Sequence, residues 1–373
     1  MSMQARIPAT MMRGGTSKGL YFRAEDLPDE VAARDRILLA AMGSPDIRQI
    51  DGVGGADPLT SKVAIVSPST REGADVDYLF CQVVVNEAVV DTKPNCGNML
   101  AGVGPFAIEK GMVKATGSET TVRIFMVNSG MIAAATVRTP DGRVDYDGDV
   151  HIDGVPGEAA GIPIAFLDTE GSACGALLPT GRLVDTIDGI DVTLIDNGMP
   201  VVVLEAAALG RTAYETREQM NADAELKKRL ESIRLLAGPM MNLGDVANQV
   251  VPKMSLVAPP RAGGAVCTRT FIPHVCHSTI GVLGAVTVAT ACVLPGSVGA
   301  RVAKVPDGAR KRVSVEHPTG EFSVDLDVGG TAESPKVERA ALLRTARPLF
   351  EGAILVPARA WNADTQRRDT HHG

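Results

Sequence analysis

The chain has 373 residues, of which 45% are hydrophobic, 22% charged and 3% aromatic. Its net charge of −7 and its few aromatic side chains argue against the basic, aromatic surface typical of nucleic-acid-binding proteins. The N-terminus has no apolar signal core, and no apolar run is long enough to cross a membrane. With six scattered cysteines, we expect a cytoplasmic protein of about two domains, with reduced thiols and no membrane or nucleic-acid partner.

Four predicted helices fall into two kinds. Residues 28–42 and 216–236 are expected to form surface helices, the second with charges such as Lys227 and Glu231 on one side. Residues 96–110 and 277–294 are apolar on nearly all sides and rich in Gly and Ala, so each must be enclosed by other elements. When Gly104 is aligned with Gly284, Cys96 falls over Cys276, which suggests a duplicated fold.

The remaining pattern predicts strands, separated by Gly, Asp and Asn turn signals. The clearest are residues 120–128, 131–139, 143–154 and 190–206. We therefore predict an α+β, mostly antiparallel fold with two similar domains, each a sheet wrapped around one apolar helix. The predicted boundaries are 1–183, completed by a C-terminal strand near 349–360, and 184–348. The N-termini of the two apolar helices would then face one cleft, where small-molecule sites are common.

Cys96 opens the first apolar helix within "NCGNML". A helix N-terminus has a positive dipole end and free N–H groups, which favour a thiolate. Asn95, Gly97 and Asn98 are small or hydrogen-bonding neighbours that could admit a ligand. The alternative is a buried structural cysteine, which is the interpretation we keep for Cys81, Cys174, Cys267 and Cys292.

Two Gly-rich stretches could bind an anion. "RGGTSKG" includes Arg13, and "GVGGADPLTSK" ends at Lys62. Neither has the spacing of a phosphate-binding P-loop, so a carboxylate is the better candidate. The alternative is that both cations are solvated surface charges.

The second half offers a comparable group. Arg269 could hold a carboxylate with two hydrogen bonds, and His277 and Ser278 fall at a predicted helix start. Thr319 and Gly320 lie in a turn before a strand. The alternatives are a simple N-cap for Ser278 and a packed histidine. His274 and Cys276 are close to His277, but no second ligand pair is visible, so we predict no metal.

Several stretches taken together resemble a known family. They are "MRGGTSKGLYF", "DGVGGADPLTSKVAIV", "NCGNMLAGVGPFAIEKG", "DNGMPVVVLEA", "PKMSLVAPP", "FIPHVCHSTIGVLGAV" and "EHPTGEF" followed by "RTARPLFEG". This ordered set resembles the PrpF family from about Arg6 to Val356. The resemblance implies the diaminopimelate-epimerase-like fold. It also implies an isomerase that moves protons and double bonds in small polycarboxylates without a cofactor.

The resemblance assigns the family's catalytic pair to Lys62 and Cys96. Its substrate-carboxylate contacts fall on Arg13, Ser17, Asn98, Arg269, His277, Ser278 and Thr319. True epimerases have a second cysteine followed by Gly-Thr-Gly at the other helix start, whereas this chain reads "VCHSTIG" around Cys276. That departure weakens a two-cysteine amino-acid racemase.

The activity implied most directly is keto–enol tautomerisation of 4-oxalomesaconate, a step of gallate degradation. One member of the pair would remove a proton from carbon and the other would protonate the enolate oxygen. One alternative is 1,3-allylic isomerisation of the double bond in a related polycarboxylate: aconitate, methylitaconate or oxalomesaconate itself. Another is a non-catalytic carboxylate-binding module. The sequence leaves a homodimer open.

Overall fold

The structure is a computed structural model that describes residues 4–167, 169–330 and 335–361. The chain divides into two compact units. Unit 1 extends to Ile164 and resumes at Arg344, and unit 2 is Ala165–Leu343. The boundary predicted between residues 183 and 184 lies within unit 2. No described helix has the length and apolar character needed to cross a bilayer.

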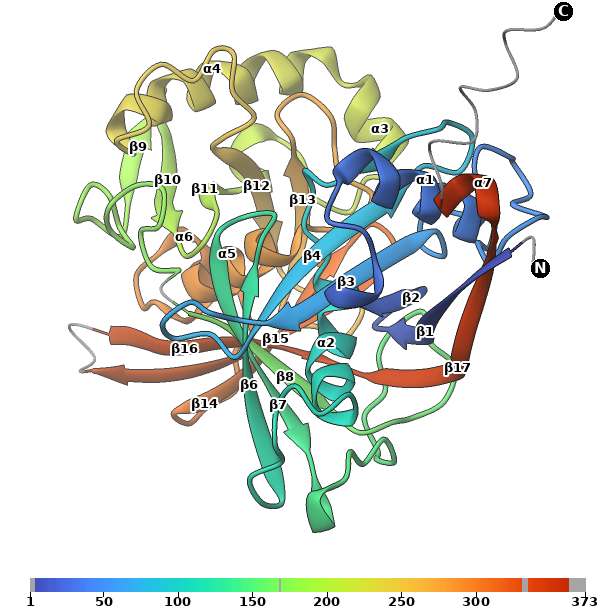
Figure 1. The fold of residues 1–373 in the computed structure, drawn as a ribbon. Coiled ribbons are helices and arrows are strands. Elements are labelled where there is room, and N and C mark those ends of the chain that lie inside the picture. The colour runs from blue at the N-terminus through green and yellow to red at the C-terminus, as the bar shows by residue number, and fades with distance from the viewer. Residues whose placement is uncertain (1–3, 168, 331–334, 362–373) are drawn as a thin grey trace, which may run out of the picture. The chain divides into compact units, whose positions relative to one another are not determined.

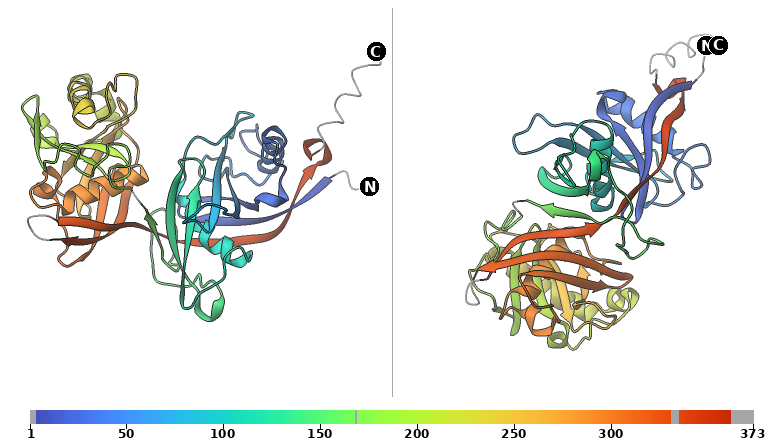
Figure 2. Two further views of the ribbon diagram at one scale, coloured as in Figure 1. Left: turned by 60° about the vertical axis from the view of Figure 1, so that its left-hand side comes forward. Right: turned by 90° about the horizontal axis from the view of Figure 1, so that it is seen from below.

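Unit 1 contains β1 (Gln4–Gly14), β2 (Ser17–Arg23), α1 (Val31–Met42), β3 (Lys62–Pro68), β4 (Val76–Val83), β5 (Val90–Asp91), α2 (Gly97–Glu109), β6 (Glu119–Met126), β7 (Met131–Arg138), β17 (Ala346–Pro357) and α7 (Ala358–Trp361). The ladder runs β1–β2 antiparallel, β2–β3 parallel, β3–β4 antiparallel, β4–β6 parallel and β6–β7 antiparallel. The C-terminal strand β17 pairs antiparallel with β1, and Figure 2 shows the two side by side.

Helix α2, labelled in Figure 1, is buried in unit 1 from Met99 to Ala107. Strands β1, β2, β3, β4, β6, β7 and β17 all pack against it. Its glycines permit this close approach, because a Cβ atom at Gly102 would lie 2.5 Å from the Tyr21 hydroxyl oxygen. Helix α1 covers the other side of β3, with Ile37 and Leu38 in a core shared with Val63. The prediction of an enclosed apolar helix is therefore confirmed.

Unit 2 contains β9 (Asp185–Ile187), β10 (Ile190–Asp196), β11 (Pro200–Glu205), α3 (Arg217–Ala222), α4 (Ala224–Met240), β12 (Lys253–Ala258), β13 (Val266–Phe271), α5 (Val282–Val293), α6 (Val298–Val302), β14 (Arg310–His317), β15 (Gly320–Gly330) and β16 (Pro335–Arg344). Strand β8 (Ile162–Phe166) connects the two units along the chain.

The two units repeat one order of elements. In unit 2 the ladder runs β10–β11 antiparallel, β11–β12 parallel, β12–β13 antiparallel, β13–β14 parallel and β14–β15 antiparallel. Helices α3 and α4 occupy the place of α1, and α5 that of α2. Strands β10, β11, β14 and β15 pack against α5. The prediction of a duplicated, mostly antiparallel α+β fold is confirmed by this repetition.

Three sequence predictions of local structure were wrong. Residues 143–154 form no strand, because Gly and Asp interrupt the pattern and Gly154 has a φ of 81°. The helix predicted over 216–236 is two helices, since Asp223 ends α3 and caps α4 by accepting from the Leu226 N–H. Helix α5 begins at Val282 rather than near His277.

Candidate active site

Cys96 is the N-cap residue of α2, with extended backbone geometry (φ −134°, ψ 98°). Its carbonyl oxygen accepts the Leu100 N–H at 3.0 Å, but its thiol makes no capping hydrogen bond. The amides of Gly97 and Asn98 follow directly, in the first turn, where N–H groups have no partner within the helix. Cys96 is partly exposed, whereas the other five cysteines are buried. The structure therefore combines an accessible thiol with a helix N-terminus.

Two buried tyrosines support this end of α2. The Tyr21 hydroxyl donates to the Met99 carbonyl at 2.5 Å, and the Tyr78 hydroxyl donates to the Cys96 carbonyl at 3.4 Å. Burial, followed by the charge of Cys96, raises the pKa of both phenols well above 10. The tyrosines therefore stay neutral donors that hold the helix start.

The turn between β1 and β2 packs against the same helix start. A Cβ atom at Gly14 would lie 2.4 Å from the Asn98 carbonyl oxygen, and one at Gly15 would lie 2.2 Å from Asn98 Oδ1. Asn98 Nδ2 also donates to Thr16 Oγ1 at 2.9 Å. The "RGGTSK" and "NCGN" stretches, which the sequence presented separately, thus meet through these two glycines and Asn98.

Ser17 follows this turn and is only 1% exposed. Leu20 and Phe22 point into the core beneath α1. Because strand side chains alternate, Ser17 and Gly19 face the α2 side. The Ser17 hydroxyl has no hydrogen-bond partner among the described residues. A buried hydroxyl without a protein partner is available to a ligand.

Lys62 is the first residue of β3 and is 7% exposed. Its Nζ donates to Gln82 Oε1 at 2.6 Å and lies 5.0 Å from the centre of the Phe80 ring. The Gln82 amide nitrogen donates to the carbonyls of Pro58 and Ser61, so its oxygen is held toward Lys62. No carboxylate pairs with Lys62 in the part of the chain that the structure describes. Lys62 is therefore a buried cation without an anion.

Gly19 brings the Lys62 backbone close to α2. It stands opposite Lys62 in the parallel β2–β3 ladder. A Cβ atom on Gly19 would lie 2.1 Å from the Lys62 carbonyl oxygen and 2.8 Å from the Met99 methyl group. Both the start of β3 and the first turn of α2 therefore pack directly on this glycine.

The rest of the "GVGGADPLTSK" loop has a structural role in the described residues. The Gln49 side chain donates to Ser61 Oγ at 2.7 Å and accepts the Ala56 N–H at 3.0 Å. A Cβ atom at Gly54 would lie 2.2 Å from the Gln49 side chain. The glycines thus wrap around Gln49, which orients the segment that ends at Lys62.

Arg13 lies on the opposite side of β1 from Gly14. Neighbouring Gly14 faces Asn98, so Arg13 points away from α2. Its guanidinium donates to the carbonyls of Gly15 and Thr345, and it lines a cavity of about 300 Å³ that Arg347 also lines. Burial and the charge of Arg347 lower the pKa of Arg13. The predicted contact between Arg13 and a substrate carboxylate stays a prediction.

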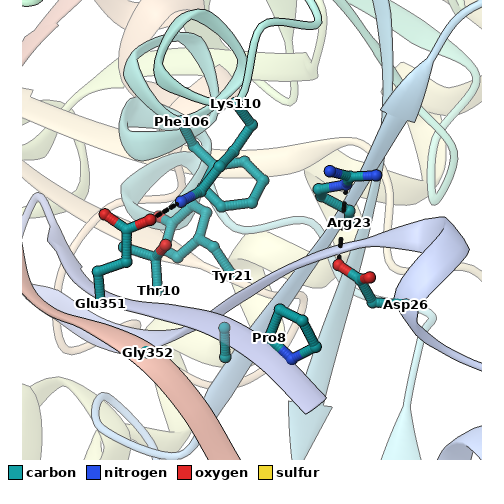
Figure 3. Close-up of a pocket in the computed structure, with 10 residues that line it drawn as sticks. Pro8, Thr10, Tyr21, Arg23, Asp26, Phe106, Lys110, Glu351 and Gly352 are labelled. Atoms are coloured by element: carbon teal, nitrogen blue, oxygen red, sulfur yellow. Dashed lines mark hydrogen bonds and ion pairs between the residues drawn. The ribbon is translucent and has the colours of Figure 1, made fainter.

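A second cavity, of about 150 Å³, lies near the other end of α2 (Figure 3). Lys110 and Glu351 form an ion pair at its edge, and Thr10 and Tyr21 line it beside Phe106. None of the predicted site residues lines this cavity, so we do not assign it to the active site.

In unit 2, Arg269 is 7% exposed and faces α3 and α4. It shares the side of β13 that carries Cys267 and Phe271, both part of the core beneath these helices. Its Nε donates to the Glu215 carbonyl at 2.7 Å and its Nη1 to the Thr268 carbonyl at 2.8 Å. Backbone carbonyls thus occupy these donors, and the contact of Arg269 with substrate stays a prediction.

His277 and Ser278 lie in the loop before α5. His277 Nδ1 accepts the Thr279 N–H at 2.9 Å, so in the neutral ring Nε2 carries the proton. Burial lowers the pKa of His277, which keeps the ring neutral. Thr319 Oγ1 donates to the Ser278 carbonyl at 3.0 Å. Thr319 lies in the turn of the β14–β15 hairpin, where Gly320 pairs with His317. The structure therefore brings these predicted residues of unit 2 together.

Cys276 differs from Cys96 in its surroundings. It is fully buried in the core beneath α3 and α4, and it bridges to Phe271 in extended geometry. Burial raises the pKa of its thiol to about 11. Because Gly281 is the N-cap of α5, the alignment of Cys276 with Cys96 does not give the two cysteines the same place at a helix start.

Sequence reasoning missed the residues that orient the pair. Gln82 is a polar residue near the end of the mostly apolar strand "VDYLFCQV", and Gln49 is a buried polar residue with a φ of 47°. Asn95 is exposed, and Gly97 is the first residue of α2. The described residues contain no group of His, Cys, Asp or Glu side chains that could hold a metal ion.

Known proteins that this chain closely resembles include isomerases and a tautomerase. The structure superposes on that of methylitaconate-delta-isomerase with a TM-score of 0.84 at 37% identity, covering 97% of this chain and 98% of that one. The (4E)-oxalomesaconate Delta-isomerase of Novosphingobium sp. (strain KA1) is 64% identical over 94% of this chain and 97% of that protein. The 4-oxalomesaconate tautomerase of Pseudomonas putida is 58% identical over 96% and 98%. The chain is an isomerase, as predicted.

The family follows from a second comparison. The family model described as PrpF protein matches residues 4–357. The chain belongs to the PrpF family, which confirms the resemblance found in the sequence. The alternative of a non-catalytic carboxylate-binding module is set aside, since these relatives are named as isomerases.

Proposed function

We propose that the protein is a keto–enol tautomerase that acts on 4-oxalomesaconate, with Lys62 and Cys96 as its proton-transfer pair. Two features of unit 1 support this proposal: a buried lysine with no carboxylate partner among the described residues, and a partly exposed thiol at a helix N-terminus. Gly19 lies against both the Lys62 backbone and the first turn of the helix that Cys96 caps. The two relatives named for oxalomesaconate isomerisation support the choice of substrate.

The chemistry needs two proton transfers. In the keto form a methylene lies between a ketone and an unsaturated carbon, so its protons are acidic. One member of the pair removes a methylene proton, which leaves a dienolate with its charge shared between the ketone oxygen and a distant carbon. The other member protonates the oxygen and gives the enol. Acid–base catalysis of this kind contributes about 10²–10⁴-fold.

The surroundings of the pair suit a substrate that gains negative charge. The first-turn amides of α2 can receive carboxylate or enolate oxygens, and so can the Ser17 hydroxyl, which has no partner in the described part of the chain. Asn95, Asn98 and Gly97 border the same helix start. These groups, with no redox or Lewis-acid step required, are consistent with an enzyme that works without a cofactor. We place the activity in gallate degradation in the cytoplasm.

The second candidate is isomerisation of the double bond of the same substrate. It shares the first proton transfer and the dienolate, but the proton returns to the distant carbon rather than to oxygen. The 64% identity to a (4E)-oxalomesaconate Delta-isomerase favours this candidate.

The test combines substitution with an ultraviolet assay, because the conjugated enol absorbs differently from the keto form. Cys96→Ala and Lys62→Ala are each expected to abolish turnover while circular dichroism stays unchanged. Lys18→Ala is the matched control, since Lys18 is in the same hairpin but faces away from α2. If either Cys96→Ala or Lys62→Ala turned over substrate at nearly the wild-type rate, the assignment of the pair would be refuted.

Incubation in D₂O followed by NMR separates the two candidates. A tautomerase leaves no stable deuterium in the enol first formed, before the reverse reaction sets in, because the new O–D bond exchanges with solvent. A double-bond isomerase leaves deuterium on the carbon that received the proton.

A further inference from the structure

Lys253 is a buried lysine of unit 2 for which the described residues supply no hydrogen-bond acceptor or anion. It is the first residue of β12 and is 8% exposed. Among the described residues, no acceptor forms a hydrogen bond with its ammonium group and no carboxylate pairs with it. Lysine is almost never buried in this way unless it is paired. A buried cation of this kind is stabilised when an anion binds to it.

Its position in the fold repeats that of Lys62. Each lysine opens the strand that follows the surface helix, β3 in unit 1 and β12 in unit 2. Lys62 stands opposite Gly19 in the parallel β2–β3 ladder, and Lys253 stands opposite Val201 in the parallel β11–β12 ladder. The duplication therefore places a lysine at one topological point in both units.

The strand on the other side explains why Lys253 has no acceptor. In unit 1, the residue opposite Lys62 is Gln82, which accepts its hydrogen bond. In unit 2, Met254 pairs with Phe271, so the same register continued by one residue puts Ile272 opposite Lys253. An isoleucine side chain cannot accept a hydrogen bond.

Lys253 faces the α5 side of its sheet. Met254 and Leu256 belong to the core beneath α3 and α4, so Lys253 and Ser255 point the other way. Ser255 Oγ lies 2.8 Å from Thr270 Oγ1, which places Thr270 on this side too. Arg269, one residue earlier in β13, consequently points to the opposite face. Lys253, rather than Arg269, is the cation on the α5 face of these two strands.

His277 lies beside this face. The backbone N–H of His277 donates to the Thr270 carbonyl at 2.8 Å, which makes the segment before α5 a neighbour of β13. The charge of Lys253 contributes to the lowered pKa of His277, after burial and the charge of Arg217. The Nε2–H group of the neutral ring is free of the Thr279 contact made by Nδ1. An anion near Lys253 could therefore also accept from His277.

Arg234 adds a second positive charge near Lys253. It is fully buried, and its donors are taken by Glu231 and by the carbonyls of Val246, Gln249 and Val251. Burial, with the charge of Arg234 second, lowers the pKa of Lys253 to about 8. At neutral pH Lys253 is still mostly protonated, so it can bind an anion.

We propose that Lys253 is a carboxylate-binding residue of unit 2, which holds a carboxylate of a small polycarboxylate together with the Nε2–H of His277. The site rests on the proposed function for the identity of the ligand, a small polycarboxylate. Its role is substrate binding, distinct from the proton transfers assigned to Lys62 and Cys96.

The experiment measures binding of tricarballylate, a saturated tricarboxylate that cannot undergo the reaction, by isothermal titration calorimetry at pH 7. Lys253→Met is expected to raise the Kd, and the KM for oxalomesaconate, by roughly tenfold to a hundredfold, because a charge-assisted hydrogen bond is lost. Lys253→Arg is expected to recover part of the affinity. Lys228→Met, which removes an exposed lysine of α4, is the matched control and should bind as the wild type does.

Unchanged Kd and KM in Lys253→Met would overturn the proposal, and so would a wild type that does not bind tricarballylate. A thermal melt of each variant excludes unfolding as the cause of weaker binding. The two proposals fail separately. Suppose that the wild type does not turn over oxalomesaconate, but that it binds tricarballylate and Lys253→Met binds it more weakly. The proposed function would then be wrong, and the carboxylate site would stand.

Discussion

Gly19 and Lys62 stand opposite each other in the β2–β3 ladder, and a Cβ atom on Gly19 would lie 2.1 Å from the Lys62 carbonyl oxygen. The same Cβ atom would lie 2.8 Å from the Met99 methyl group in the first turn of α2. No side chain fits at this point. The absence of a Cβ atom therefore sets how closely the strand that begins with Lys62 approaches the helix that begins after Cys96.

The first prediction concerns Gly19→Ala. The new methyl group must push back the Lys62 backbone, the Met99 side chain or both, since real Cβ contacts are not this short. Overpacking of this kind costs about 1–3 kcal/mol of stability. We expect a lower free energy of unfolding in urea and at least a tenfold loss of kcat.

Gly284→Ala is the control for this substitution. Gly284 lies inside α5, and its nearest contact would be Ile280 Cγ1 at an ordinary 3.7 Å. Alanine is favoured over glycine in a helix by about 1 kcal/mol, so this variant should be as stable as the wild type or more so. Equal stability and activity of Gly19→Ala and wild type would contradict the close packing at Gly19.

The second prediction concerns Gln82→Leu. Gln82 holds the Lys62 ammonium group, and leucine retains the bulk while removing the acceptor. We expect kcat to fall by about tenfold or more, because Lys62 loses its fixed position, while KM changes little. Steady-state kinetics separates the two constants. A fall in stability with unchanged kcat would mean that Gln82 only anchors the loop through Pro58 and Ser61.

The third prediction concerns thiol reactivity. Cys96 is partly exposed, whereas burial raises the pKa of Cys81, Cys174 and Cys292 to about 12 and that of Cys276 to about 11. Thiolates are the reactive form. Iodoacetamide at neutral pH should therefore modify one thiol of the folded protein.

Peptide mass mapping should locate that modification at Cys96, and tricarballylate should slow it if the site binds carboxylates. Cys96→Ala should show no fast modification. Rapid labelling of a second cysteine in the folded protein would contradict the burial of the other five.

The sequence was sufficient for the architecture because the decisive signals are local. Helices α2 and α5 lack a polar face, and a helix of this kind must be enclosed. The helix start at Cys96 was also predictable. The start of α5 was not, since Cys276 bridges to Phe271 and the backbone N–H of His277 donates to the Thr270 carbonyl, which holds this segment against β13.

The arrangement of the site depended on strand register, which composition does not reveal. Arg269 reads as a carboxylate-binding arginine, yet the alternation of β13 turns it toward α3 and α4. Lys253 reads as an ordinary strand residue in "PKMSLVAPP". Only the ladder partners Val201 and Phe271 reveal that it repeats the position of Lys62.

The fourth prediction concerns the cost of keeping Lys253 buried. Its pKa in the folded protein is about 8, below the ordinary value of 10.5, because of burial and the charge of Arg234. Between these two values the unfolded chain binds the proton more strongly, so folding stability contributed by Lys253 rises with pH across this window. Below pH 8 the folded state carries the full penalty, which amounts to about 3 kcal/mol at most.

Lys253→Met removes the penalty, so the variant should be more stable than the wild type at pH 7, and the difference should shrink as pH rises through 8 toward 10.5. Urea unfolding of both proteins at several pH values gives this difference and cancels the titration of all other groups. His277 titrates below this window, so it does not imitate the effect. A constant difference across the range, or a variant that is less stable at pH 7, would contradict a buried and unpaired Lys253. A more stable variant that binds tricarballylate weakly would show that stability is sacrificed at this position for carboxylate binding.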